Sequence, residues 1–166
     1  MSELESRIGW QEFQKLAPDA YAAISAISKA VSASSLEKDL VEMLKLRASQ
    51  INGCAFCTQY HLNEARRLGV ASSKLDLLAV WREAGIFSER EQAALAWTEK
   101  LTRIAGDHVS DEEYAAIAAH FAPAELSMLT TAIGLINIWN RIAGPFRFTP
   151  PIPHHEIQPK HETVNA

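Results

Sequence analysis

Hydrophobic residues recur every three or four positions along most of the chain, and no segment alternates strictly between apolar and polar residues. This period predicts an all-α domain of six or seven helices. Helix starts are marked by Ser, Asp or Pro, and several ends are marked by Gly. The division into seven gives the ranges 18–32, 35–51, 54–68, 73–83, 88–104, 110–120 and 123–142.

The C-terminal part changes from a strongly apolar helix to a proline-rich end. The helix expected up to Ile142 is apolar on nearly all sides, which is typical of a central core helix or a subunit contact. Its apolar stretch is shorter than the roughly 20 residues that a bilayer requires, so no membrane span is expected. The prolines after Gly144 predict an extended arm or tail. We therefore expect one domain over 1–145, with its core over 35–145, and an arm over 146–166.

Composition and charge restrict the class of protein. With 166 residues and 48% hydrophobic content, the chain is sufficient for one domain with a sizeable core. Met1 to Trp10 lacks the apolar run of a signal peptide, so the expected location is cytoplasmic. The net charge is −4 and no basic cluster extends beyond Arg66 and Arg67, so no nucleic-acid partner is expected. In a reducing compartment, paired cysteines are typical of catalysis or metal binding.

The two cysteines of the chain, Cys54 and Cys57, follow Asn52-Gly53 and are separated by two residues. If a helix begins at the Asn-Gly break, both thiols and His61 share one face, at i, i+3 and i+7. A helix N-terminus stabilises a thiolate. The His61 ring, four residues after Cys57, is expected to lie over that sulfur. The pattern indicates a redox dithiol with a base beside it.

A carboxylate is expected to join this group from the preceding helix. If the helices on either side of residues 51–53 form an antiparallel hairpin, a residue ten before the turn faces one about ten after it. Glu42 then lies level with His61. A carboxylate there would orient the imidazole and hold a proton, which completes an arrangement of nucleophile, base and orienting group.

The spacing of these four residues resembles that of a known family. Glu42, Cys54, Cys57 and His61 are similar to the core motif of the alkylhydroperoxidase D and carboxymuconolactone decarboxylase superfamily, Glu-x11-Cys-x2-Cys-x3-His. Segments 44–54 and 136–141 are also similar to peroxidase-like members. The resemblance covers about residues 35–145.

The resemblance implies an all-α fold that assembles as a homotrimer or hexamer and reduces hydroperoxides with thiols. In this scheme Cys57 matches the peroxidatic cysteine, which becomes a sulfenic acid, and Cys54 matches the resolving cysteine. His61, as general base and acid, and Glu42 match the proton relay. An external dithiol, either a lipoyl group or a thioredoxin-like protein, would reduce the disulfide again. No cofactor or metal ion is expected.

The roles of the two cysteines have conflicting indications. Helix position favours Cys54 for the lower thiol pKa, whereas the i, i+4 histidine and the family pattern favour Cys57 for attack on the peroxide. We adopt Cys57 as the attacking residue. The chain also departs from the family. Phe56 stands where the best-characterised alkylhydroperoxidase D proteins carry a second histidine, and the carboxymuconolactone decarboxylases proper lack the cysteine pair.

Other interpretations predict different behaviour. The protein would be a decarboxylase-like small-molecule enzyme of the same fold, or a redox sensor whose disulfide forms without turnover. The cysteines would alternatively be small core residues. Zinc usually takes four ligands, and the two thiols with His61 supply at most three. Arg47 and Arg141 are interpreted as buried structural ion-pair partners.

Overall fold

The computed structural model describes residues 5–153. This part of the chain forms nine α-helices and one 3₁₀-helix, with no strand, which confirms the predicted all-α class. The helices are α1 (Trp10–Leu16), α2 (Pro18–Ser32), α3 (Lys38–Ile51), α4 (Ala55–Arg67), α5 (Ser72–Leu77), η1 (Leu78–Val80), α6 (Trp81–Ala84), α7 (Glu89–Thr102), α8 (Asp111–Ala118) and α9 (Pro123–Phe146).

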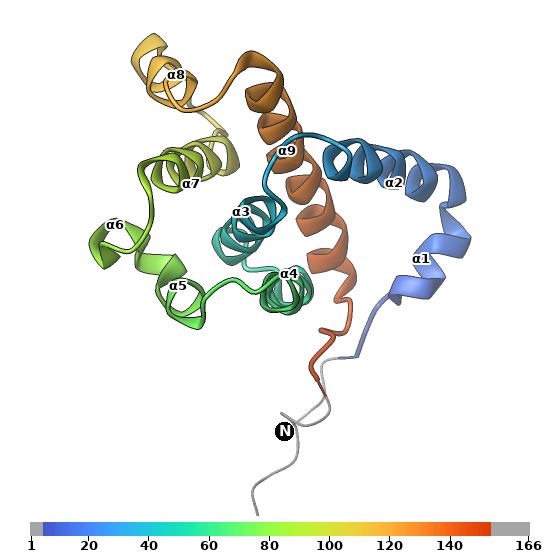
Figure 1. The fold of residues 1–166 in the computed structure, drawn as a ribbon. Coiled ribbons are helices and arrows are strands. Elements are labelled where there is room, and N and C mark those ends of the chain that lie inside the picture. Colours follow the sequence, from blue (N-terminus) through green and yellow to red (C-terminus); the bar gives the residue numbers. More distant parts are fainter. Residues whose placement is uncertain (1–4, 154–166) are drawn as a thin grey trace, which may run out of the picture.

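Helix α9 runs through the middle of the molecule, with α1 and α2 to its right and α5 to α8 to its left in the view of Figure 1. It packs against α2, α3, α4 and α7, while α3 packs against α4, α7 and α9. The strongly apolar sequence of α9 therefore matches its place at the centre of the fold. Helices α3 and α4 are neighbours joined by the short Asn52–Cys54 connection, which is the predicted hairpin.

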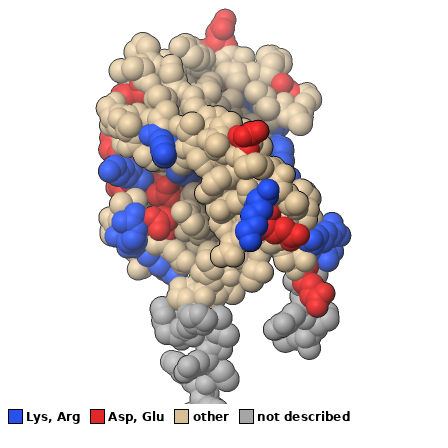
Figure 2. All heavy atoms as spheres, turned by 90° about the vertical axis from the view of Figure 1, so that its right-hand side faces the viewer, with Lys and Arg blue, Asp and Glu red and all other residues tan. Residues whose placement is uncertain are grey.

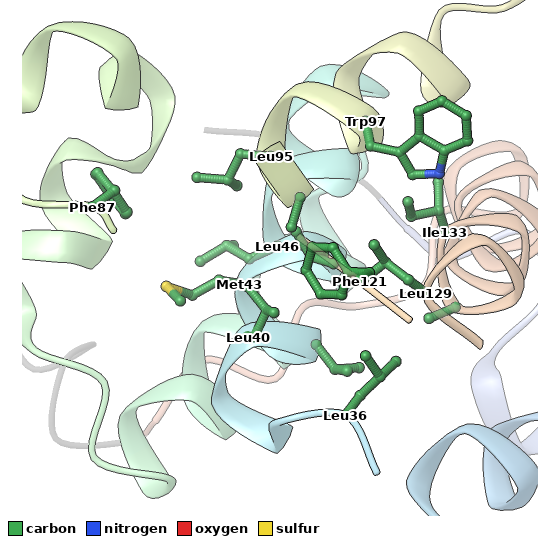
Figure 3. Close-up of a cluster of buried hydrophobic side chains, with 14 of the residues drawn as sticks. Leu36, Leu40, Met43, Leu46, Phe87, Leu95, Trp97, Phe121, Leu129 and Ile133 are labelled. Atoms are coloured by element: carbon green, nitrogen blue, oxygen red, sulfur yellow. The ribbon is translucent and has the colours of Figure 1, made fainter. Parts of the chain in front are cut away.

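The larger hydrophobic core lies where α3, α7 and α9 meet. Figure 3 shows side chains from these three helices pointing into a common interior. On α3, Leu40, Met43 and Leu44 are almost fully buried, at the i, i+3 and i+4 spacing that the sequence pattern predicts. Full burial of one such side chain stabilises the fold by about 1.5–3 kcal/mol. The core thereby fixes α3, the helix that carries Glu42.

A smaller apolar cluster surrounds the two cysteines. It draws on segments far apart in the sequence. Its buried members are Phe13, Ala48, Cys54, Cys57, Ile136, Ala143 and Phe148. Aromatic side chains pack against them, among them Trp10, Tyr21, Phe56 and Trp139. The thiols thus lie in an interior built by both ends of the described chain.

Two helical segments differ from the sequence-based expectation. Helix α1 was not expected, because its seven residues offer only one buried position, Phe13, as a periodic signal. The helix expected over 73–83 is instead divided into α5, η1 and α6. Leu75, Leu78 and Trp81 are all buried and are spaced by three residues. This spacing matches the three residues per turn of a 3₁₀-helix better than the 3.6 of an α-helix.

The predicted end of the last helix was wrong. Helix α9 continues through Pro145 to Phe146, and Arg147 ends it in a left-handed conformation, with φ 56°. Proline this near a helix end removes only one backbone hydrogen bond. The N-terminal segment supplies others: the Arg7 backbone N–H donates to the Phe146 carbonyl at 2.9 Å, and its guanidinium donates to the Pro145 carbonyl at 3.1 Å.

The described part of the expected arm, residues 147–153, has no regular secondary structure. Phe148 nevertheless packs into the cluster around the cysteines and is 3% exposed. The Asn63 side chain donates to the carbonyl of Pro151 at 2.9 Å. This stretch therefore packs on the domain, while the rest of the expected arm, 154–166, lies outside the described residues.

Within the part of the chain that the structure describes, no single helix has the length and apolar character needed to cross a membrane. Among the helices of residues 5–153, α8 and α9 are the one pair long and apolar enough when taken together, and they are bent by 113° at their junction.

Candidate active site

The α3–α4 hairpin brings Glu42 and His61 into contact, as the turn geometry predicted. The Nδ1 atom of His61 lies 2.6 Å from Oε2 of Glu42. The other carboxylate oxygen accepts a hydrogen bond from the Lys45 ammonium at 2.8 Å. Both carboxylate oxygens are therefore held, so the imidazole has one fixed orientation.

The two partners differ in their protonation. Burial favours the neutral form of Glu42, but the hydrogen bond to His61 and the charges around it outweigh burial and lower the pKa of Glu42 to about 2. Burial lowers the pKa of His61. We therefore assign an ionised Glu42 and a neutral His61 whose Nδ1–H donates to the carboxylate. The Nε2 lone pair is then the proton acceptor.

Cys54 lies at the N-terminus of α4, one residue before the helix proper. Its sulfur accepts a hydrogen bond from the Cys57 backbone N–H at 3.4 Å, in the manner of an N-cap. Cys54 and Cys57 are 2% and 3% exposed, and both are free thiols. The predicted start of this helix at residue 54 is thus displaced by one position, which leaves both sulfurs at the N-terminal end.

The two thiols have opposite pKa directions. The Cys57 thiol donates a hydrogen bond to the Cys54 sulfur, which lowers the pKa of Cys54 to about 7 against the effect of burial. The same hydrogen bond, together with burial and the charge on Cys54, raises the pKa of Cys57. The first negative charge of the dithiol therefore resides on Cys54, as its position in the helix suggested. Because the one proton of the Cys57 thiol is directed to Cys54, it is not donated to His61.

A cavity of about 540 Å³ opens beside this group. Cys57, His61 and Glu42 line it, whereas Cys54 is not among its lining residues. The rest of the wall combines aromatic and aliphatic side chains with hydroxyl and charged groups. A molecule in the cavity therefore meets the sulfur of Cys57 first. Access and pKa thus distinguish the two thiols: Cys57 is the accessible sulfur and Cys54 is the acidic one.

The sequence analysis missed Asn140, a polar residue of α9 that is 5% exposed. Its side-chain amide hydrogen-bonds to both thiols and lowers both pKa values. The amide is held in place by Ser49, whose Oγ accepts from it at 3.1 Å, and by Asn52, which donates to it at 2.8 Å. An asparagine in a largely apolar helix was the signal that could have identified it, because buried polar groups require partners.

The two arginines singled out in the sequence have different environments. Arg47 forms a buried ion pair with Glu99 at 2.6 Å, as predicted. Glu99 also accepts from Trp81 at 3.0 Å and from Arg82 at 2.6 Å. Arg141, in contrast, is exposed and donates to the backbone and side chain of Asn137, so its interpretation as a buried ion-pair partner was wrong. It faces outward because the opposite side of α9 is the buried one.

Among residues 5–153, no three His, Cys, Asp or Glu side chains converge so that they could hold a metal ion. His154 and His155 lie outside this range.

Comparisons with known proteins define the class. Residues 18–100 match the model of the carboxymuconolactone decarboxylase family, and the chain therefore belongs to this family. It is 34% identical over 131 residues to the uncharacterized protein YdfG of Bacillus subtilis, covering 79% of this chain and 89% of that protein. It is 33% identical over 106 residues to the uncharacterized protein YnjA of Escherichia coli, covering 63% of this chain and 57% of that one.

Solved structures place the fold in the alkylhydroperoxidase D-like group. A protein of unknown function from Agrobacterium tumefaciens, provisionally named as the antioxidant defence protein AhpD, has a TM-score of 0.84 and 40% identity, covering 90% of this chain and all of that one. An alkylhydroperoxidase AhpD core protein from Ralstonia eutropha shares the fold at 22% identity and a TM-score of 0.74, covering 84% and 74%. The debrominase Bmp8 does so at 19% identity and a TM-score of 0.74, covering 82% and 74%.

Proposed function

We propose that this protein is a thiol-dependent hydroperoxide reductase in which Cys57 attacks the peroxide and Cys54 resolves the product. The observation that carries the proposal is one shared cavity. It brings an accessible cysteine together with a neutral histidine fixed by a carboxylate, while a second, acidic cysteine lies behind the first. Family membership and the antioxidant naming of the Agrobacterium relative support it.

The first step requires a thiolate on the sulfur that faces the cavity. The proton of Cys57 passes to the Cys54 thiolate along their hydrogen bond, which moves the charge to Cys57. Cys57 then attacks the distal oxygen of the hydroperoxide, the O–O bond breaks, and Cys57 becomes a sulfenic acid. The alkoxide that leaves needs a proton. His61 delivers it: Nε2 takes up a proton from solvent water, Glu42 stabilises the resulting imidazolium, and the imidazolium passes the proton to the alkoxide.

The second step uses the acidity of Cys54. The hydrogen bonds from Asn140 and from the backbone of Phe56 and Cys57, which help to lower the pKa of Cys54 in the reduced protein, favour its thiolate, the form that attacks a sulfenic acid. Its attack on Cys57 forms the disulfide and releases hydroxide, which is protonated to water. One hydroperoxide and one dithiol thus give one alcohol, one water and one disulfide. An external dithiol, a lipoyl group or a thioredoxin-like protein, then reduces the disulfide by exchange.

Thiol counting combined with intact mass measurement tests the cycle. The reduced protein receives one equivalent of an organic hydroperoxide and then an excess of dihydrolipoamide. We expect loss of both thiols without intermolecular species, followed by full recovery and repeated consumption of peroxide. Cys54→Ser lacks the thiolate that takes up the Cys57 proton, so it should form a sulfenic acid on Cys57 more slowly than the wild type loses its thiols, and a dimedone-type reagent should trap it, whereas Cys57→Ser should not react. Persistence of both thiols in the wild type would refute the proposal.

The same experiment separates the other candidate functions. A redox sensor would form the disulfide in proportion to added peroxide but would not turn over with dithiol. A decarboxylase-like enzyme would keep its activity in the double cysteine-to-serine variant. The shared fold of the debrominase Bmp8 makes halogenated aromatic compounds a useful second substrate panel if peroxide fails.

Assembly forms part of the proposal. We propose a homotrimer or hexamer, following the family resemblance, and light scattering of the purified protein gives the test. A strict monomer at micromolar concentration would contradict this part and leave the thiol chemistry untouched.

A further inference from the structure

The residues that line the active-site cavity differ in chemistry between its two ends. Near Cys57 it is aromatic: the ring of Trp10 stacks on Phe56 at 5.7 Å, and Tyr21 meets Trp139 at 6.3 Å. Of these residues, Tyr21 lies in the N-terminal part of α2 and Phe56 in the N-terminal part of α4. The cavity therefore begins between the starts of these helices, beside the sulfur.

Toward the C-terminal ends of α2 and α4 the cavity wall becomes basic. Lys29 on α2 and Arg67 on α4 line it there. Lys38 also lines it, one turn before Glu42 on α3. Because α3 runs antiparallel to α4 and Glu42 lies beside His61, Lys38 is on the far side of that pair from the thiols.

Two of these cations are available to a ligand. Lys45 and Arg67 have carboxylate partners within the cavity wall, Glu42 and Glu64. Lys29 and Lys38 are exposed and form no ion pair with any residue among 5–153. Four basic side chains and two acidic ones thus line a cavity in a chain whose net charge is −4.

This excess of positive charge is local. The face that carries α1 and α2 is mostly uncharged, and its basic and acidic side chains lie in small mixed groups (Figure 2). A broad basic field that would attract any anion is not seen on this face. The available ammonium groups therefore favour a ligand whose anionic group enters the far end of the cavity itself.

The length of the cavity restricts that ligand further. From Cys57, the basic end lies about eight to ten helical residues along α4, a distance of about 12–15 Å at 1.5 Å per residue. An extended chain advances about 1.2 Å per bond. Roughly ten to twelve bonds would therefore separate the anionic group from the atom that reacts at Cys57.

We propose that the cavity selects long-chain fatty acid hydroperoxides, with the carboxylate bound by Lys29 and Lys38 and the peroxide group, near the middle of the chain, placed at Cys57. The remaining hydrocarbon packs against the aromatic end. The peroxide is reduced to the hydroxy fatty acid and the dithiol is oxidised to the disulfide, with the second oxygen released as water. This inference rests on the proposed peroxidase function and names its substrate class.

Turnover measurements on three hydroperoxides test the selection. These are linoleic acid hydroperoxide, its methyl ester and the small neutral cumene hydroperoxide, all with dithiothreitol, so that no reductant carries a carboxylate. We expect kcat/KM to favour the acid over its ester, with a preference that decreases as salt is raised. Each exposed ion pair contributes up to about five-fold, so Lys29→Gln with Lys38→Gln should reduce kcat/KM for the acid by about ten-fold. Turnover of the ester and of cumene hydroperoxide should not change.

Lys15→Gln is the matched control, since Lys15 is an exposed lysine on α1 outside the cavity lining. Calorimetric binding of linoleate and methyl linoleate to the reduced wild type and the double variant gives a readout that does not depend on turnover. Linoleate should bind more tightly than its ester, and the difference should disappear in the double variant.

The outcomes separate this inference from the function on which it rests. Equal turnover of acid and ester with normal turnover of cumene hydroperoxide would overturn the proposed substrate class but would remain consistent with the proposed peroxidase function. Lysine-dependent binding of linoleate without consumption of any hydroperoxide would refute the peroxidase but support the fatty acid site. Neither lysine-dependent binding nor turnover would overturn both.

Discussion

The reduced protein should lose its first thiol proton near pH 7, and that proton should come from Cys54. The hydrogen bonds around its sulfur lower the pKa of Cys54 from an ordinary value of 9.0 to about 7, which corresponds to about 2.7 kcal/mol in favour of the thiolate. At pH 7 about half of Cys54 is then ionised, compared with about one per cent of an ordinary thiol. A thiolate of lower pKa is intrinsically less nucleophilic, by about eight-fold here, so the net gain in reactivity is about six-fold.

Thiolate absorbance in the ultraviolet, followed against pH, provides the assay, and three variants assign the titration. Cys57→Ser keeps a hydroxyl donor to the Cys54 sulfur, so the step should stay near pH 7. Cys57→Ala removes that donor, the largest cause of the lowered pKa. A hydrogen bond to a charged group is worth about 1.5–3 kcal/mol, so the step should move up by about one to two pH units. Cys54→Ser leaves only the buried Cys57, and no step should appear below pH 9.

A step near pH 7 that persists in Cys54→Ser and is lost in Cys57→Ser would refute this reasoning. It would place the first negative charge on Cys57, and the internal proton transfer proposed for the first chemical step would be unnecessary. Equal titration of Cys57→Ser and Cys57→Ala would contradict a smaller point, namely that the Cys57 side chain is the main donor.

Three further predictions follow from the same contacts. Asn140→Ala should raise the pKa of Cys54, and Asn140→Asp should raise it more because a carboxylate repels the thiolate; an unchanged thiolate titration would contradict the contact. Glu42→Gln should slow peroxide consumption by about 10²-fold with the circular dichroism of the fold retained, since His61 loses the carboxylate charge that stabilises its protonated form. Glu42 and Glu99 each have a pKa of about 2 in the fold against 4.5 ordinarily, so the stability that each provides is complete above pH 4.5 and is lost as the pH falls toward 2. Each should contribute at most about 3 kcal/mol to this loss, and urea unfolding at several pH values would show a smaller acid sensitivity in Glu42→Gln and Glu99→Gln if the assignment holds.

Several features of the site followed from local geometry that a sequence can express. A period of 3.6 residues predicts helices, and Asn52-Gly53 predicts the turn between two of them. Once that hairpin is assumed, the rise per residue places Glu42 level with His61, and the structure brings them to 2.6 Å. The family resemblance, which rests on the same spacing, was confirmed by the match over residues 18–100.

Other features depended on segments that meet only in the folded chain. Asn140 reaches the thiols from a helix more than eighty residues away in sequence, and Phe148 and Trp10 close the cluster from opposite ends of the chain. Nothing in the local pattern around Cys54 indicates these neighbours. The short helix that carries Trp10 gave too weak a periodic signal to be recognised.

The chemistry of the site likewise depends partly on local sequence and partly on contacts between distant segments. The sequence by itself determined most of the helices, the four polar groups that share the α3–α4 hairpin, and the family to which the pattern is similar, because these depend on helical periodicity over a short stretch of chain. The tertiary structure decided between the two thiols by giving Cys54 the lower pKa, and it alone showed that Cys57 lines the cavity and that two lysines without ion-pair partners among the described residues lie at its far end. Burial, hydrogen-bond partners and the shape of a cavity arise from the packing of distant segments, and these quantities set a pKa or select a substrate.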